Sequence, residues 1–336
     1  MYYYPGWKNN QPGAPWALPW DPIKAYPERE PLLGWYPEGQ VAIAEQHIQW
    51  MSDYGIDYAV YDWYWDGKAV LGGHALNAYL QAKNNYRVKF SLLWDNHILG
   101  VPNSLEEFKG MVKYWLDNYF LRPQYFQIEG KPVVTVFSAY DLREHAKKFL
   151  SPTTGQPMTT KELLQMANDM AKEKGLPGIY FIAGISNGEF WADFAEDNVY
   201  SALSSYNLHS GMGDDSAIAS HTYSELSDDY SEHWRWLLKN AALPYLPPMT
   251  SGWDSRPWGG STSDPLHDNS VSTPASFETH LRSAKAQMDL YPAKTMKTGV
   301  ICCWNEFGEG SYIEPTKKYQ FQYLEKVKKV FGVSGN

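Results

Sequence analysis

Short apolar runs and amphipathic stretches alternate along the chain. Apolar runs bounded by turn residues predict buried strands, and longer stretches with apolar residues every three or four positions predict helices. The predicted strands span residues 1–4, 56–63, 88–94, 132–137, 178–183, 199–203, 244–249 and 298–304. The predicted helices span residues 41–54, 74–84, 104–119, 160–174, 224–240, 276–290 and 319–330, with a shorter one at 189–195. Ser104 with Glu107, and Thr160 with Glu162, resemble helix N-caps.

Eight strands, each followed by a helical segment, predict an α/β protein built as a single (β/α)8 TIM barrel. The length of 336 residues suits one such barrel, so residues 1–336 are expected to form a single catalytic domain. Three long connections, 5–40, 203–223 and 251–275, are rich in Gly, Pro, Ser, Asp and Trp, and each follows a strand. In a barrel, such loops lie over the C-terminal face, where sites are built.

Composition narrows the class of partner. The formal net charge is −9, which disfavours nucleic acid and anionic membrane surfaces. Aromatic residues make up 16% of the chain, with 15 Trp and 25 Tyr. Trp and Tyr combine an apolar face with a polar group, which suits sugar binding, although a large aromatic core is the plainer explanation.

The two cysteines and the chain's ends say little about location. Cys302 and Cys303 are adjacent in a predicted strand, where neighbouring side chains point to opposite faces, so no disulfide is expected between them. No apolar run is long enough for a membrane span, and no leader is visible. A secreted, periplasmic or cell-surface location is expected only from the substrate class developed below, with a cytoplasmic location left open.

Acidic residues stand beside aromatic residues at several predicted strand ends. Each single Asp could cap a helix and each single Trp could belong to the core, but a set that converges on one face favours a binding site. The candidate substrate-binding residues are Tyr4, Asp62, Trp63, Trp65, Trp94, Asp95, Tyr206, Trp253, Asp254, Trp304 and Asn305.

The last predicted strand leads into Glu306 and Glu309, which are three residues apart in a segment with two glycines. Buried carboxylates need partners or a function. A carboxyl pair beside aromatic platforms is the equipment of glycoside hydrolysis, where one group protonates the leaving oxygen and the other assists attack at the anomeric carbon. Glu306 and Glu309 are therefore the candidate catalytic residues.

The segment 305–310, Asn-Glu-Phe-Gly-Glu-Gly, followed by Ile313-Glu314-Pro315, resembles the signature of glycoside hydrolase family 99, the endo-α-mannosidases and endo-α-mannanases. It is still more similar to the family-99-like group labelled WbsX. Supporting matches are Tyr3-Tyr4-Pro5, His47-Ile48, 54–57 and 130–133, so the resemblance covers nearly the whole chain.

This resemblance implies a retaining glycosidase that acts on α-linked glycans. The second glutamate of the family motif falls on Glu309 and implies the general acid and base. The first falls on Glu306 and implies the group that deprotonates the sugar 2-hydroxyl, which attacks C1 to give a 1,2-anhydro sugar. The implied partner is an oligosaccharide or polysaccharide, and this chemistry needs no cofactor and no metal.

Departures from the family pattern leave the two glutamates in place and bear on which sugar is recognised. The family motif usually carries Trp-His between the glutamates, where this chain has Phe307-Gly308, and Thr-Gln where it has Ser311-Tyr312. The third strand ends in 93–95, Leu-Trp-Asp, instead of His-Ile-Glu. Mannose is thus one candidate sugar among several.

Three other functions stay open. A glycosyltransferase of polysaccharide synthesis would need a phosphate cradle or an acidic metal site, and no glycine-rich phosphate loop is present. A non-catalytic carbohydrate-binding barrel would be expected to lack one of the glutamates. A serine hydrolase is suggested by residues 184–188, Gly-Ile-Ser-Asn-Gly, which fit a nucleophile elbow. The histidines show no metal-ligand spacing.

Overall fold

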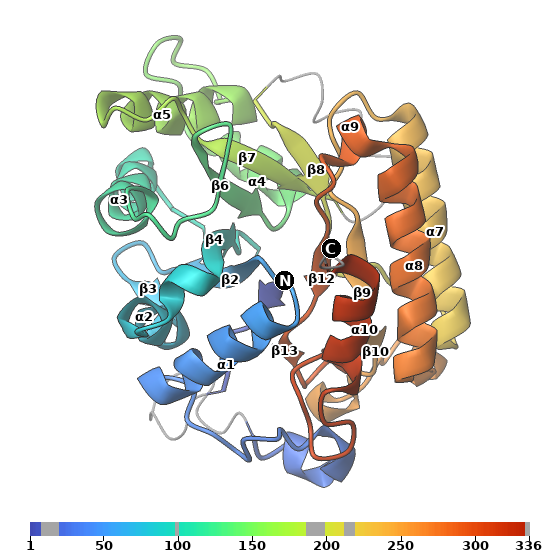
Figure 1. Cartoon of the computed structure of the whole chain (residues 1–336). Helices are drawn as coiled ribbons and strands as arrows, with labels where there is room; N and C mark the ends of the chain where they lie inside the picture. Colours follow the sequence, from blue (N-terminus) through green and yellow to red (C-terminus); the bar gives the residue numbers. More distant parts are fainter. Residues whose placement is uncertain (8–19, 98–100, 186–198, 212–218, 333–336) are drawn as a thin grey trace.

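The computed structural model of the chain describes residues 1–7, 20–97, 101–185, 199–211 and 219–332. Its centre is a curled, parallel sheet with helices around the outside (Figure 1). Six strands follow one another along this sheet: β1 (Tyr2–Tyr3), β2 (Tyr58–Trp65), β4 (Lys89–Trp94), β6 (Lys131–Val136), β7 (Tyr180–Gly184) and β8 (Ala202–Ser204). A separate parallel pair joins β9 (Pro248–Thr250) to β12 (Val300–Cys302). The predicted α/β class with a parallel sheet is confirmed.

Backbone hydrogen bonds connect the pair to both edges of the six-stranded run. Leu203 of β8 forms a parallel bridge with Tyr245, just before β9. On the other side, the Trp304 amide, beyond β12, donates to the Tyr2 carbonyl oxygen of β1 at 2.8 Å. All eight of these strands overlap or adjoin a predicted strand, within a few residues at each end. The observed strands follow one another along the chain as the hydrophobic pattern predicts.

The described helices are α1 (Val41–Asp53), α2 (His74–Gln81), α3 (Leu105–Trp115), α4 (Ala139–Ala146), α5 (Thr160–Glu173), α7 (Tyr223–Asn240), α8 (Pro274–Leu290), α9 (Pro292–Thr295) and α10 (Gln322–Phe331). Seven of these helices match predicted ones, with small differences at their ends, while α4 and α9 were not predicted. Ser104 caps α3 as expected, by accepting from the Glu107 amide. The cap of α5 is Thr159 rather than Thr160, because Thr159 forms the reciprocal pair of bonds with Glu162. The predicted helix 189–195 lies outside the described residues.

Several short elements were not predicted. A π-helix (Leu116–Phe120) continues α3, and α4 begins directly after β6. Small strands form hairpins or ribbons at the ends of the main strands. They are β3 (Val70–Leu71), β5 (Gln127–Ile128), β10 (Gly252–Trp253), β11 (Ser270–Val271), β13 (Asn305–Glu306) and β14 (Ser311–Tyr312). Two-residue strands carry too short a pattern to be recognised.

Strand alternation divides the core into two parts. Side chains of one parity, such as Tyr2, Val60 and Leu93, pack inside the curled sheet. Those of the other parity, such as Tyr61 and Leu92, pack against the helices outside. Inward-facing side chains at the C-terminal ends of the strands therefore point into the space enclosed by the loops that follow these strands.

Cys302 and Cys303 form a disulfide, so the expectation of no disulfide is wrong. Cys302 is the last residue of β12 and Cys303 follows it, so the alternation of strand side chains does not apply to this pair. The peptide bond between them is cis.

Candidate active site

A cavity of about 660 Å³ lies at the C-terminal ends of the parallel strands. Residues near the C-terminal end of β2, and residues at or after the ends of β1, β4, β6, β7, β8, β9 and β12, contribute to its wall. Five carboxyl groups line it: Asp62, Asp95, Asp141, Glu306 and Glu309. Among the described residues, the lining contains no Lys or Arg. The cavity is acidic.

Glu306 lies in the β13–β14 hairpin, which the first residues of the chain hold in place. The Asn305 side chain accepts from the Tyr4 amide and donates to the Tyr4 carbonyl oxygen, both at 2.9 Å. It also donates to buried Glu38 at 3.0 Å, and the Trp7 indole donates to the Asn305 carbonyl oxygen at 2.7 Å. The side chain and the carbonyl group of Asn305 are thus both held, which places the backbone from which the Glu306 side chain extends.

A single tyrosine hydroxyl joins Glu306 to Asp62. The Tyr206 oxygen lies 2.9 Å from Glu306 Oε1 and 3.0 Å from Asp62 Oδ2. Because this hydroxyl has one hydrogen, it donates to one carboxylate only, and the other contact needs a proton on the carboxyl group. Burial, with the nearby like charges, raises the pKa of Glu306 and of Asp62 well above their ordinary values. The three groups therefore share a proton.

Glu309 lies in the turn between β13 and β14. Its Oε2 accepts a hydrogen bond from Asn207 Nδ2 at 3.2 Å, and Asn207 follows β8. Burial raises the pKa of Glu309 to about 7, although the Asn207 bond favours its ionised form. A carboxyl group with a pKa near 7 can both donate and accept a proton at neutral pH.

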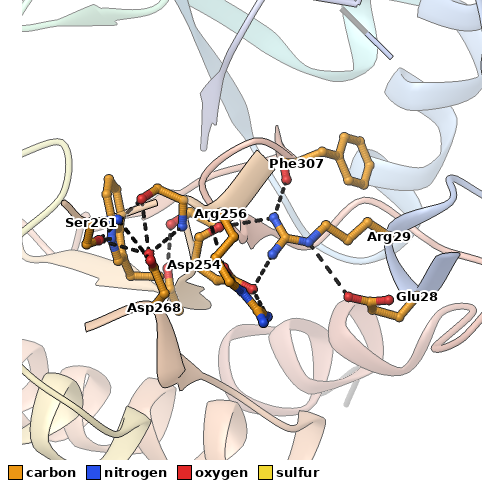
Figure 2. Close-up of polar contacts among 11 residues, drawn as sticks. Glu28, Arg29, Asp254, Arg256, Ser261, Asp268 and Phe307 are labelled. Carbon is orange, nitrogen blue, oxygen red and sulfur yellow. Dashed lines mark hydrogen bonds and ion pairs between the residues drawn. The ribbon is translucent and has the colours of Figure 1, made fainter. Parts of the chain in front are cut away.

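A buried ion-pair cluster holds the backbone on either side of Glu309. Arg29 donates to Asp254 Oδ2, to the Asp254 carbonyl oxygen at 3.1 Å and to the Phe307 carbonyl oxygen at 2.6 Å (Figure 2). Arg256 also pairs with the Asp254 carboxylate, at 2.6 Å. The Asp254 amide in turn donates to the Glu309 carbonyl oxygen at 2.6 Å. Arg29 and Asp254 thus position the segment that carries both glutamates.

The structure places seven of the sequence-predicted site residues on the cavity wall. They are Tyr4, Asp62, Asp95, Tyr206, Trp253, Glu306 and Glu309. Two more are next to it without lining it: Asn305 anchors the hairpin, and Asp254 is only 2% exposed inside its arginine pairs. Asp254 therefore belongs to the support of the site and not to the binding surface.

Four predicted tryptophans, Trp63, Trp65, Trp94 and Trp304, lie in the core instead of the cavity. In β2, alternation turns Asp62 inward and Trp63 and Trp65 outward, where Trp63 packs against Trp115 of α3. Trp94 has the same outward parity, next to inward Leu93. Trp304 packs edge-on against His47 of α1. The prediction that these four bind substrate took no account of which face they occupy.

Eleven lining residues were not predicted: Tyr64, His97, Phe137, Ser138, Tyr140, Asp141, Gly184, Ile185, Asn207, His209 and Trp258. Strand parity could have found Tyr64, which alternates with Asp62 in β2. Asn207 stands beside predicted Tyr206. Residues 137–141 follow β6 and include the pair Tyr140-Asp141, which was overlooked because it lies in α4, a helix that was not predicted. Nothing in the pattern marks Trp258 within its long loop.

The structure gives little support to the other kinds of site considered from the sequence. Gly184, the first residue of the nucleophile-elbow pattern, is accounted for by packing, because a Cβ there would overlap the carbonyl oxygens of Val136 and Phe137. Ser186 lies outside the described residues. In the described part of the chain, no group of three His, Cys, Asp or Glu side chains is arranged to hold a metal ion. No described helix is long and apolar enough to cross a membrane.

Two solved structures share the fold of this chain. The GH99 endo-α-mannosidase from Bacteroides thetaiotaomicron superposes with a TM-score of 0.65 at 16% identity, over 98% of this chain and 94% of that chain. A glycoside hydrolase-like protein superposes with a TM-score of 0.65 at 14% identity, over 91% of this chain and 90% of that one. At such identities the likeness shows a shared fold.

Residues 102–327 match the family model described as "Glycosyltransferase WbsX", which covers more than half of the chain, so the protein belongs to this family. The predicted resemblance to the family-99-like WbsX group is confirmed. No curated protein sequence matches the chain.

Proposed function

We propose that this protein is a retaining glycoside hydrolase that cleaves α-linked glycans, mannose-containing glycans among them. Its residues 1–336 would form one catalytic domain, a (β/α)8 barrel that β9 and β12 close between β8 and β1. The observation that carries this proposal is the carboxyl pair Glu306 and Glu309, which lines a cavity whose described wall holds no Lys or Arg. Asp254, which supports the same segment, is paired with two arginines, and no described Lys or Arg pairs with Glu306 or Glu309.

The proton arrangement supports separate roles for the two glutamates. If Asp62 carries the shared proton, it donates to Tyr206, and Tyr206 donates to Glu306, which is then ionised. In agreement with a neutral Asp62, its other oxygen, Oδ1, is buried and has no hydrogen-bond partner among the described residues. Glu306 is then a base although burial raises its pKa, while Glu309, with a pKa of about 7, is protonated in about half of the molecules at pH 7.

The proposed reaction uses these two states. Glu309 donates its proton to the glycosidic oxygen as the bond to C1 breaks. Glu306 takes the proton of the 2-hydroxyl, whose oxygen attacks C1 and forms a 1,2-anhydro sugar. Water then attacks C1 and gives a proton to Glu309, while Glu306 returns its proton to O2 as the C1–O2 bond of the epoxide opens. Two inversions at C1 leave its configuration retained, and both carboxyl groups return to their starting states.

Because the family model is named for a glycosyltransferase, transfer from a nucleotide sugar is the second candidate. A nucleotide diphosphate needs cationic or amide donors. The acidic lining of the described wall disfavours it. Of the segments outside the described residues, only 8–19 contains a cationic residue in its sequence, Lys8. Hydrolysis of a glycan outside the cytoplasm would also agree with a secreted, periplasmic or cell-surface location, which we propose with the function.

The test is a reducing-end assay on a panel of α-linked polysaccharides and glycoprotein glycans, with wild type beside Glu309→Ala. The proposal predicts new reducing ends from wild type alone. Calorimetric titration with nucleotide sugars is the matched arm, for which we expect no binding. Nucleotide-sugar binding together with a silent panel would overturn the hydrolase in favour of the transferase.

A further inference from the structure

The cavity wall next to Glu309 is made by residues that follow β8 and β9. Trp253, Trp258 and His209 line this side. The loop that carries Trp253 and Trp258 is tied to the glutamate segment by the bond from the Asp254 amide to the Glu309 carbonyl oxygen. These three side chains are called the β9 wall below.

Trp258 is an exposed aromatic side chain held in a fixed place. It is 45% exposed, although it lines the cavity, and its ring lies parallel to that of Trp7, with centroids 6.2 Å apart and 9° between the planes. A Cβ on Gly308 would overlap its indole, so the indole occupies the space that a side chain at position 308 would fill. Gly308 lies between the two glutamates in the sequence, so Trp258 packs against the segment that carries them.

Asp268 makes the Trp258 loop rigid. Its carboxylate accepts from the Ser255 amide at 2.9 Å and from the Ser261 amide at 2.8 Å, so it bridges the two ends of the loop (Figure 2). The Trp253 indole donates to the Ser261 hydroxyl at 3.0 Å. An aromatic ring that is exposed and immobilised costs little entropy when a sugar ring stacks on it.

The hydrogen bonds of His209 fix which of its nitrogens carries the proton. His267 Nδ1 lies 2.8 Å from the Ser220 carbonyl oxygen, which can only accept, so Nδ1 of His267 is protonated. In a neutral ring its Nε2 then accepts from His209 Nδ1, 3.1 Å away. Desolvation of His209 within the wall of the cavity, with the charge of His267, lowers the pKa of His209 to about 4, and burial lowers that of His267, so both rings are neutral at pH 7.

His209 Nε2 is consequently an unprotonated acceptor. His209 is exposed to the cavity, and its described hydrogen bonds with other protein groups use Nδ1 and the main chain. Its ring meets that of Trp253 edge to face at 4.2 Å, which fixes its plane. A fixed acceptor beside an aromatic surface recognises a hydroxyl group on a ring.

We propose that the β9 wall is the subsite for the sugar residue on the leaving-group side of the cleaved bond, where Trp258 stacks against the sugar ring and His209 Nε2 accepts a hydrogen bond from one of its hydroxyls. The assignment rests on the proposed function, because the leaving oxygen must lie against Glu309. The carboxyl groups around the cavity make the sugar a neutral one, since an anionic sugar would be repelled.

The first test needs no substrate. Nitrogen NMR on the full chain with labelled histidine reports the tautomer of each ring, and His209→Asn identifies the His209 signal by its loss. The proposal predicts a neutral His209 protonated at Nδ1 at pH 7. A His209 that is charged, or protonated at Nε2, would overturn it.

The second test compares an α-mannan with α-mannobiosyl fluoride, which has no sugar on the leaving-group side. Trp258→Ala and His209→Ala should lower kcat/KM about 10-fold or more on the polymer and less than about 2-fold on the fluoride. Tyr86→Ala, an exposed aromatic outside the cavity, is the control and should change neither.

Equal losses on the two substrates, or no loss, would contradict the subsite and leave the hydrolase intact. A wild-type enzyme that turns over neither the fluoride nor any glycan of the panel would instead contradict the proposed function. The tautomer of His209 would then still test whether His209 Nε2 is a hydrogen-bond acceptor.

Discussion

Two sets of buried acids lie within the same part of this molecule and behave in opposite ways. Asp254 and Asp268 stabilise the loops, while Glu306, Glu309 and Asp62 line the cavity. Burial opposes ionisation of Asp254, but Arg256 and Arg29 outweigh it and hold its pKa below the ordinary value. Hydrogen bonds from Ser261 and Ser255 do the same for Asp268. In the cavity set no Lys or Arg of the described part of the chain compensates burial, and the pKa values rise.

The difference shows that burial alone does not mark an acid for chemistry. Asp254 and Glu306 are 2% and 5% exposed, so exposure does not separate them. What separates them is the partner: a guanidinium in one case and a single shared hydroxyl in the other. A carboxyl group that keeps its proton near neutral pH is unfavourable for a structural ion pair and useful for acid–base catalysis.

The largest effect is expected from the substrate: hydrolysis by the cavity acids should stop when the substrate lacks the 2-hydroxyl. If Glu306 acts through the 2-hydroxyl, the 2-deoxy analogue of a turned-over glycosyl fluoride should not be hydrolysed, because no oxygen is present to attack C1. The measurement is fluoride release beside the parent compound. Comparable rates on both would exclude this role.

Removing the acid Glu309 should lower the rate by a factor that depends on the leaving group. Glu309→Ala should lower turnover of natural glycans about 10²–10⁴-fold and spare fluorides, whose departure needs little protonation. Kinetics on the two substrates check this, and an equal loss on both would assign Glu309 another role.

Breaking the paired set should cost stability. Asp254→Ala leaves Arg29 buried without its partner, so we expect the free energy of unfolding to fall by about 3–5 kcal/mol. Asp53→Ala, which breaks the exposed pair with Arg87, is the control and should cost about 0–1 kcal/mol. Urea unfolding measures both, and similar small losses would contradict the structural role of Asp254.

The smallest expected effect is on stability. In contrast to loss of Asp254, removal of the cavity acid Glu309 should stabilise the fold at high pH. The pKa of Glu309 rises from an ordinary 4.5 to about 7, so the folded state keeps a proton that the unfolded state has released. This contribution is present below pH 4.5 and is lost as the pH rises through 7. Glu309→Gln does not titrate, so at pH 8 it should be more stable relative to wild type than at pH 4, by roughly 3 kcal/mol at most. Urea unfolding at the two pH values tests the sign.

Most of the fold could be predicted from the sequence, because hydrophobic periodicity is a local property. The apolar run that marks β2 and the helical spacing of apolar residues that marks α7, for example, are visible within each segment. The small hairpins were missed, since β13 and β14 are two residues each and depend on contacts with distant Tyr4 and Glu38.

The site was predicted in part for the same reason. Strand ends located Asp62, Tyr206 and Glu306, but strand parity, which was not applied, decides that Trp63 and Trp94 face the helices. The pairing of Asp254 with Arg29 joins residues 225 positions apart, and no local pattern reveals it. His209 and Trp258 likewise gain their proposed roles from contacts made only in the fold.

The pH dependence of kcat/KM on a natural glycan and on the matching fluoride tests the central assignment most directly. The account predicts that the glycan rate falls as the pH rises through about 7, because Glu309 loses the proton that it must donate, and that the fluoride rate lacks this fall. The same fall on both substrates, or its persistence in Glu309→Gln, would contradict the role of Glu309 as the acid.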